Sequence, residues 1–313
     1  MSEGFNPHKL SQQLSSLAQA PAPCAAQLAY RQFYQMDLSA QFAGLDWRLG
    51  NFAVGGYQIA AQLWRPESAR GTLLLLHGYY DHMGLYRHVV EWALSRQLAV
   101  LACDLPGHGL SSGRRASIDD FAEYQAVLAG LLEQAEQLSL PAPWHLCGQS
   151  TGGAIVLEHL LSGARKAPLA QSILLAPLVR PRAWAWSKLS YQLLSPFVQD
   201  IKRRFTHNSS DPSFIDFVHN HDPLQATRLP TAWVGALKQW VPRIERSARS
   251  QHSPLIIQGE QDMTVDWQHN LDVLEDKFAA PSILRLANAR HHLANEAPVL
   301  RQQYFAFLDQ HLS

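Results

Sequence analysis

The sequence predicts an α/β fold, in which helices cover both faces of a mostly parallel β-sheet. Short apolar runs bounded by glycine or proline alternate with helical patterns, and this composition is typical of buried parallel strands. The alternation covers residues 51–177 and resumes over residues 251–313, with a helical stretch between them. A rhythm that breaks and resumes indicates one α/β domain with an insertion of roughly seventy residues.

The predicted sheet begins with a hairpin. Its two strands lie within residues 52–64, around Gly55-Gly56, and Pro66 ends the second strand. The later strands are expected at 71–76, 98–103, 144–147, 172–176, 254–258 and 282–286. The helices of the domain are expected at 86–96, 118–137, 151–161, 265–278 and from about Asn295.

Two further segments flank or interrupt this domain. Residues 1–50 predict a helical extension, in which Leu10, Leu14 and Leu17 share one face and indicate packing onto the domain. Residues 178–250 predict a helical cap, or lid, with no clear strand. The many Trp and Phe residues of this segment indicate either its own core or a hydrophobic tunnel for substrate.

A basic tripeptide, Lys202-Arg203-Arg204, lies within the predicted cap. A solvated helix face is the commonest explanation for such a run. The alternative is contact with a phosphate head group or an anionic membrane surface, which would bring the cap into transient contact with a membrane.

Charge and cysteine content narrow the class of protein. The 26 Lys and Arg residues balance the 26 Asp and Glu residues, so the chain lacks the basic character of a nucleic-acid-binding protein. Cys24, Cys103 and Cys147 show no pairing pattern and indicate reduced thiols. The polar N-terminal residues do not resemble a signal peptide. The sequence contains no run of about eighteen apolar residues, the length that would predict a membrane span. These features predict a cytoplasmic protein.

The strongest chemical motif is the G-x-S-x-G pentapeptide Gly148-Gln149-Ser150-Thr151-Gly152. A strand-like run precedes it and a helical pattern follows. In the α/β-hydrolase fold, a serine on such a strand-to-helix turn is the nucleophile, and the glycines let neighbouring backbone approach. The alternative is a glycine-rich turn with a buried, inert serine.

Two backbone amides are candidates to stabilise the oxyanion that forms when Ser150 attacks a carbonyl. Thr151 opens the helix after the serine, where the helix dipole favours negative charge. In this fold the loop after the third strand supplies a second donor, here the amide of Tyr79. His77 and His82 in the same loop lack the further ligands of a metal site, so loop-bracing hydrogen bonds are expected.

A carboxylate must orient the general base and stabilise its charged form. Glu260, Asp262 and Asp266 all follow the predicted strand at 254–258. Asp266 suits the N-cap of the next helix, whereas Asp262 lies in the loop beyond the strand, so Asp262 is preferred. Asp104 precedes the serine, whereas this fold orders its triad serine, acid, histidine, so Asp104 is expected to be structural.

The general base is expected just after the last strand, where His291 and His292 are adjacent. A histidine there can reach across the sheet edge to the serine. Neighbours in an extended segment face opposite ways, so only one of the two can do so. The residue pattern leaves this choice open.

The motifs HGYYDH, DLPGHG, GQSTG, GEQD and ARHHLANE occur in this order and together resemble the monoacylglycerol lipase and lysophospholipase branch of the α/β hydrolases. The resemblance covers the chain from about residue 52 to its end. In that branch the catalytic histidine follows the arginine of the last motif, which implies His291. The resemblance equally implies Ser150, Asp262 and the Tyr79 and Thr151 amides. The bulky Tyr79-Tyr80 pair and Thr151 depart from the common pattern and bear on substrate choice.

The resemblance implies a serine hydrolase that cleaves esters of single-chain lipids, a lysophospholipid or a monoacylglycerol, through an acyl-enzyme and without metal or cofactor. One long acyl chain and a polar head match a lidded apolar pocket. A general carboxylesterase, a thioesterase or an acyltransferase would use the same residues. A non-catalytic ligand receptor on the same fold is an alternative of another class, against which the complete set of triad residues argues. Ser150 argues against dehalogenase and epoxide hydrolase chemistry, which would need a carboxylate at this position.

Overall fold

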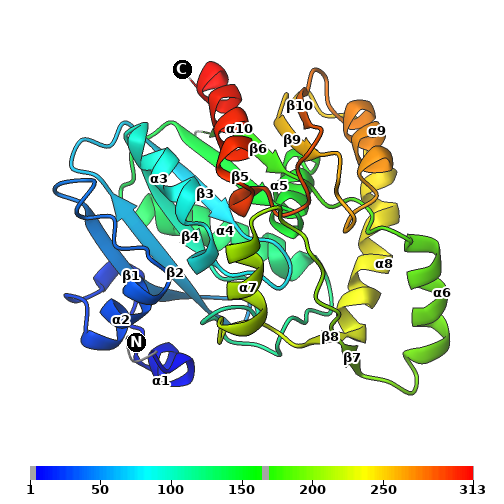
Figure 1. Cartoon of the computed structure of the whole chain (residues 1–313), viewed down its shortest axis with the longest axis horizontal. Coiled ribbons are helices and arrows are strands. Elements are labelled where there is room, and N and C mark those ends of the chain that lie inside the picture. Colours follow the sequence, from blue (N-terminus) through cyan, green and yellow to red (C-terminus); the bar gives the residue numbers. More distant parts are fainter. Residues whose placement is uncertain (1–4, 164–168, 313) are drawn as a thin grey trace.

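The core of the protein is one β-sheet. Its strands are β1 (Asp46–Val54), β2 (Tyr57–Arg65), β3 (Gly71–Leu76), β4 (Leu98–Cys103), β5 (Trp144–Gln149), β6 (Leu169–Leu175), β9 (Leu255–Gly259) and β10 (Ser282–Leu286). In the computed structural model, which describes residues 5–163 and 169–312, these eight strands lie in the order β1-β2-β4-β3-β5-β6-β9-β10 (Figure 1). β2 pairs antiparallel with β1 and β4, and the later pairs are parallel.

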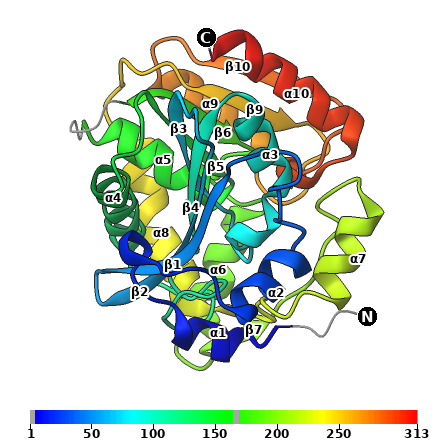
Figure 2. The same cartoon turned by 90° about the vertical axis from the view of Figure 1, so that its left-hand side faces the viewer.

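Helices cover both faces of the sheet. The helices of the domain are α3 (Arg87–Ser95), α4 (Ala122–Gln137), α5 (Thr151–Leu161), α9 (Trp267–Lys277) and α10 (Pro298–His311). Alternate side chains of a strand face opposite sides, so Leu74 packs with α4 and α5 while Leu73 packs with α3 and α10. Figure 2 views the sheet nearly edge-on, with α4 and α5 on one side and α3 on the other. The predicted α/β class, with a mostly parallel sheet covered on both faces, is confirmed.

The first hairpin is longer than predicted. β1 begins at Asp46, whereas the sequence predicted a strand from Phe52 and a helical extension to residue 50. Trp47 and Leu49 are buried, and Asp46 is paired in register with Arg65 of β2. The first part of β1 forms because it pairs with β2. Two alternating apolar residues are too short a pattern to predict that pairing.

The N-terminal segment packs against the core. It contains α1 (Pro7–Gln13), a 3₁₀ turn (Leu17–Gln19) and α2 (Ala25–Phe33). Leu10, Leu14 and Leu17 are buried, so the packing expected of their shared face is confirmed, although α1 ends before the second of them.

The chain between β6 and β9 holds a mainly helical insertion. It contains α6 (Trp184–Leu194), β7 (Asp200–Lys202), α7 (Pro212–Asn220), β8 (Arg228–Pro230) and α8 (Thr231–Glu245). β7 and β8 form a short antiparallel pair, so the expectation of no strand is wrong. Strands of three residues are too short to show an alternating pattern, and they exist only because distant segments pair. Among the described ranges, no helix is long and apolar enough to cross a membrane.

Candidate active site

Ser150 lies on the sharp turn between β5 and α5. Its backbone has φ 53° and ψ −109°, a conformation that residues other than glycine rarely adopt. A Cβ on Gly148 would lie 2.3 Å from the Gly152 carbonyl carbon, and a Cβ on Gly152 would lie 2.2 Å from the Leu76 carbonyl oxygen. The two glycines therefore allow the backbone contacts that hold the serine in this turn.

Three predicted side chains meet in one hydrogen-bonded series. His291 Nε2 lies 2.9 Å from Ser150 Oγ, and His291 Nδ1 lies 2.6 Å from Asp262 Oδ2. The second carboxylate oxygen of Asp262 accepts hydrogen bonds from the Thr264 and Val265 amides at 2.8 and 3.1 Å. These amides fix the carboxylate, and the carboxylate fixes the imidazole with one nitrogen toward the serine.

The electrostatics of this series favour a charged imidazole. Burial disfavours charge on His291, but the adjacent Asp262 carboxylate outweighs it and raises the pKa of His291. Burial acts against ionisation of Asp262 as well, and the imidazole and the two backbone amides nevertheless lower the pKa of Asp262. The acid therefore stays ionised and can stabilise an imidazolium that forms beside the serine.

The loop after β3 lies against the serine. A Cβ added to Gly78 would lie 3.4 Å from the Ser150 Cβ, so the following residue, Tyr79, is next to the nucleophile. Within the described residues the Tyr79 amide donates no hydrogen bond. The Thr151 amide is at the first position of α5, where helix geometry leaves N–H groups without intrahelical partners. Both predicted oxyanion donors thus flank Ser150.

The histidines of this loop and the carboxylate after β4 have structural contacts. His77 Nε2 accepts a hydrogen bond from the Leu105 amide at 2.8 Å, and His82 Nε2 lies 2.9 Å from the Asp222 carboxylate. Asp104 accepts hydrogen bonds from the amides of Met83 and Leu110, both at 2.8 Å. The expected loop-bracing and structural roles are confirmed.

His292 faces away from the serine. Its Nε2 lies 3.0 Å from Asp81 Oδ2, and its ring packs 4.6 Å from the ring of Phe214 in α7. Asp81 also accepts a hydrogen bond from Tyr86 at 2.9 Å. Sequence reasoning gave Asp81 no role, because nothing in the chain between residues 81 and 292 shows that they meet.

A pocket of about 290 Å³ opens beside the serine. Part of its lining is apolar and comes from the segments after β6 and β9 and from β8 and α8; Leu178, Leu229, Trp233, Met263 and Val265 belong to it. Another part is polar and comes from the chain between β7 and α7, namely Arg203, Arg204, Thr206 and Asn208.

The basic tripeptide therefore does not lie on a solvated helix face, which was the commonest explanation for such a run. Lys202 ends β7, and Arg203 and Arg204 follow in a segment without regular secondary structure that borders the pocket. The sequence offered one signal for this position, the run of three positive charges.

Comparison with known proteins identifies the wider group. The family described as "Serine aminopeptidase, S33" matches residues 67–298. Monoglyceride lipase of Homo sapiens is 25% identical over 260 residues, which cover 80% of this chain and 85% of that protein. Monoacylglycerol lipase of Mycolicibacterium smegmatis is 36% identical over 113 residues, which cover 36% of this chain and 39% of that protein's length.

Solved structures match over most of the chain. A soluble variant of monoglyceride lipase from Saccharomyces cerevisiae gives a TM-score of 0.72 at 18% identity, covering 87% of this chain and 96% of that one. The alpha/beta hydrolase domain-containing protein 10 from mouse gives a TM-score of 0.63 at 15% identity, covering 85% of this chain and 98% of that one. These matches confirm the predicted α/β-hydrolase fold.

Proposed function

We propose, because the chain belongs to the serine aminopeptidase S33 family, that it is a serine hydrolase acting on carboxylic esters of single-chain lipids. The observation that carries this proposal is the series Ser150–His291–Asp262 beside a partly apolar pocket. The relatives named monoacylglycerol and monoglyceride lipases support the substrate class.

The proposed reaction proceeds through an acyl-enzyme. His291 Nε2 takes the proton from Ser150 Oγ as this oxygen bonds to the ester carbonyl carbon. The amides of Tyr79 and Thr151 hold the oxygen that becomes negative. His291 then gives its proton to the leaving alcohol as the ester C–O bond breaks. It next takes a proton from water as the water oxygen bonds to the acyl carbon, and it returns this proton to Ser150 Oγ as the bond between the acyl carbon and Oγ breaks, which releases the fatty acid.

The insertion at residues 178–250 is assigned the role of a lid. It contributes Trp233 and Leu229 to the apolar lining of the pocket. Trp186 of α6 is 69% exposed and Phe197 after it is 85% exposed, which supports transient contact of this segment with a membrane surface. The three cysteines form no disulfide, which supports a cytoplasmic location.

The family description also names aminopeptidases, which must bind a positively charged amino terminus. A carboxylate is the group that would bind it. The described residues that line this pocket include two arginines, Arg203 and Arg204, and no Asp or Glu. A pocket of this charge favours a neutral or anionic ester over a peptide with a free amino terminus.

Release of fatty acid by the purified protein tests the proposal. The substrates are 1-oleoylglycerol, oleoyl-lysophosphatidylcholine and p-nitrophenyl acetate, with Ser150→Ala as the control. We expect turnover of the long-chain esters that the variant loses. Turnover of the short ester alone would make the protein a general carboxylesterase, and absence of Ser150-dependent turnover of all three would refute the proposal.

A further inference from the structure

Arg203 is one of the two arginines that line the pocket, and it is the one whose guanidinium contacts other side chains. Among the described residues it forms no ion pair, and all the hydrogen bonds of its side chain go through NH1. We infer that Arg203 forms an anion subsite beside Ser150, and that the preferred substrate is an ester whose alcohol carries a phosphate group. This inference rests on the proposed function and names its substrate more closely.

The guanidinium of Arg203 is held rigidly. Its central carbon lies 3.9 Å from the centre of the Tyr80 ring and 4.4 Å from the centre of the Phe205 ring. NH1 donates to Gln225 Oε1 at 2.7 Å and to the Ala226 carbonyl oxygen at 3.1 Å. An arginine has five N–H donors, so Nε and NH2 keep three. That edge of the guanidinium binds two phosphate oxygens in parallel.

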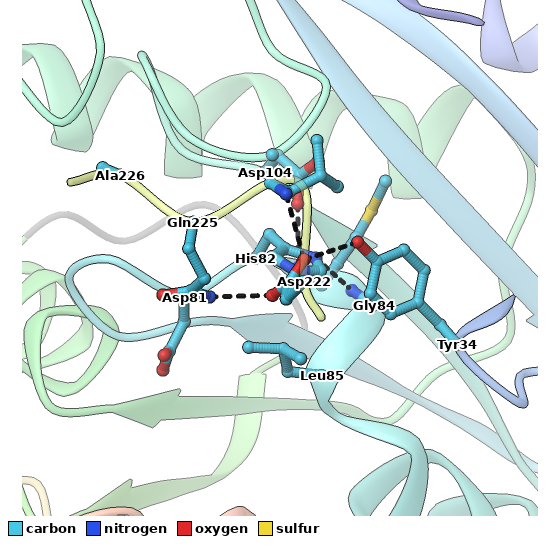
Figure 3. Close-up of polar contacts among 12 residues, drawn as sticks. Tyr34, Asp81, His82, Gly84, Leu85, Asp104, Asp222, Gln225 and Ala226 are labelled. Atoms are coloured by element: carbon cyan, nitrogen blue, oxygen red, sulfur yellow. Dashed lines mark hydrogen bonds and ion pairs between the residues drawn. The ribbon is translucent and has the colours of Figure 1, made fainter. Parts of the chain in front are cut away.

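A buried network positions Gln225 (Figure 3). Gln225 Nε2 donates to Asp222 Oδ2 at 2.8 Å, and His82 Nε2 lies 2.9 Å from the same oxygen. Tyr34 of the N-terminal segment donates to the other carboxylate oxygen of Asp222 at 2.7 Å. The network thus joins the N-terminal segment, the loop after β3 and the insertion, and it orients the amide that receives Arg203.

The charges around Arg203 leave it ready for an anion. Burial lowers the pKa of Arg203, partly offset by the phenol of Tyr80 and the carboxylates of Asp81 and Asp222. Those carboxylates already face His292 and His82. A phosphate on Nε and NH2 would supply the missing partner of this half-buried cation through charge-assisted, bidentate hydrogen bonds.

The two parts of the pocket lining place the phosphate on the alcohol and not on the acyl chain. The acyl chain of a single-chain ester gains free energy by leaving water for the apolar part, near Trp233 and Leu229. The leaving alcohol is then at the polar part, where Arg203 and Arg204 lie. A neutral glycerol would leave these cations unpaired.

The test compares 1-oleoylglycerol 3-phosphate with 1-oleoylglycerol. The measured quantity is the ratio of kcat/KM for the phosphate ester to kcat/KM for the neutral ester. We expect a ratio well above one, reduced about 10- to 100-fold by Arg203→Gln, because a bidentate charge-assisted contact is lost. Arg203→Lys keeps the positive charge but loses the bidentate guanidinium, and it is expected to reduce the same ratio about 3- to 10-fold. The matched control, Lys202→Gln, removes an equal charge from an exposed side chain that does not line the pocket.

A ratio near one in the wild-type protein, or an equal fall in Arg203→Gln and Lys202→Gln, would overturn the inference. Turnover of both esters without this dependence would leave the proposed function intact, whereas loss of Ser150-dependent turnover would refute the proposed function itself. Should Arg203→Gln fail to fold, inhibition of p-nitrophenyl ester hydrolysis replaces it. Glycerol 3-phosphate must then compete more strongly than glycerol in the wild-type protein, and less strongly in Arg203→Lys.

Discussion

His291 and His292 are neighbours in the chain and each faces a buried aspartate, yet their surroundings differ in one respect. The Nδ1 atom of His291 lies 2.6 Å from Asp262, and its other nitrogen lies 2.9 Å from Ser150 Oγ. The Nε2 atom of His292 lies 3.0 Å from Asp81, and its ring packs against Phe214. A carboxylate lies close to each ring, but only one ring reaches a nucleophile. The group on the far side of the imidazole distinguishes a proposed catalytic histidine from a structural one.

The largest expected difference between the two histidines is in turnover. We expect His291→Ala to lower kcat at least about a thousandfold, because among the described residues no other side chain is hydrogen-bonded to Ser150 Oγ. His292→Ala is expected to retain most of kcat. Steady-state hydrolysis of a single-chain ester by both variants gives the comparison, and similar losses in the two would remove the distinction.

The second difference is in stability, and its order is reversed. His292→Ala removes the imidazole that lies 3.0 Å from the buried Asp81 carboxylate, and Tyr86 is the described side chain that still donates a hydrogen bond to it. We expect the free energy of unfolding to fall by about 3 kcal/mol, the usual effect of breaking a buried pair. Denaturant unfolding measures it, with His311→Ala on the exposed end of α10 as the control. A loss no larger than that of the control would contradict the structural role of the His292–Asp81 pair.

The pH dependence sharpens the comparison further. His291 must be neutral to accept a proton, and Asp262 raises the pKa of His291 above its ordinary 6.5. Below that pKa, kcat/KM should therefore fall about tenfold per pH unit, starting above pH 6.5. Asp262→Asn removes the carboxylate that raises the pKa of His291. This variant should therefore show the fall in kcat/KM, the acidic limb of the pH profile, at lower pH, and it should also lower kcat. An unchanged limb in Asp262→Asn would assign it to another group.

The smallest expected effect concerns a third pair, His82 and Asp222. His82 outweighs the cost of burial and lowers the pKa of Asp222 to about 2, so this carboxylate is ionised at neutral pH. Tyr34→Phe removes one hydrogen bond to this ionised carboxylate and should cost about 1.5 kcal/mol of unfolding free energy. Thermal unfolding against the neighbouring Phe33→Leu as a packing control measures the effect. An unchanged Tm in Tyr34→Phe would show that the N-terminal segment gains nothing from this contact.

The core and the triad geometry were accessible from sequence because they depend on local patterns. The predicted bounds of β4, α5 and β10 coincide with the observed ones, since each is a short run of uniform character between breaking residues. Ser150 lies within one strand–turn–helix motif, and Asp262 and His291 follow the ends of two neighbouring strands. Parallel strands bring such ends together.

The strands of the insertion and the start of the first hairpin could not be predicted as well as the core. β7 and β8 exist because Asp200 and Pro230 are brought opposite each other, and no pattern of three residues reveals this. The polar network has the same origin. Its members Tyr34, His82 and Asp222 are separated by long stretches of chain, and only the path of the insertion brings them into contact.

Covalent labelling of the nucleophile tests the central assignment most directly. An alkyl fluorophosphonate reacts with a serine that a neighbouring base has activated, and intact mass and peptide mapping locate and time the adduct. We predict one adduct, on Ser150, formed at similar rates by the wild-type protein and His292→Ala and at least about a hundredfold more slowly by His291→Ala. An adduct on another residue, or labelling that depends on His292 and not on His291, would contradict the assignment.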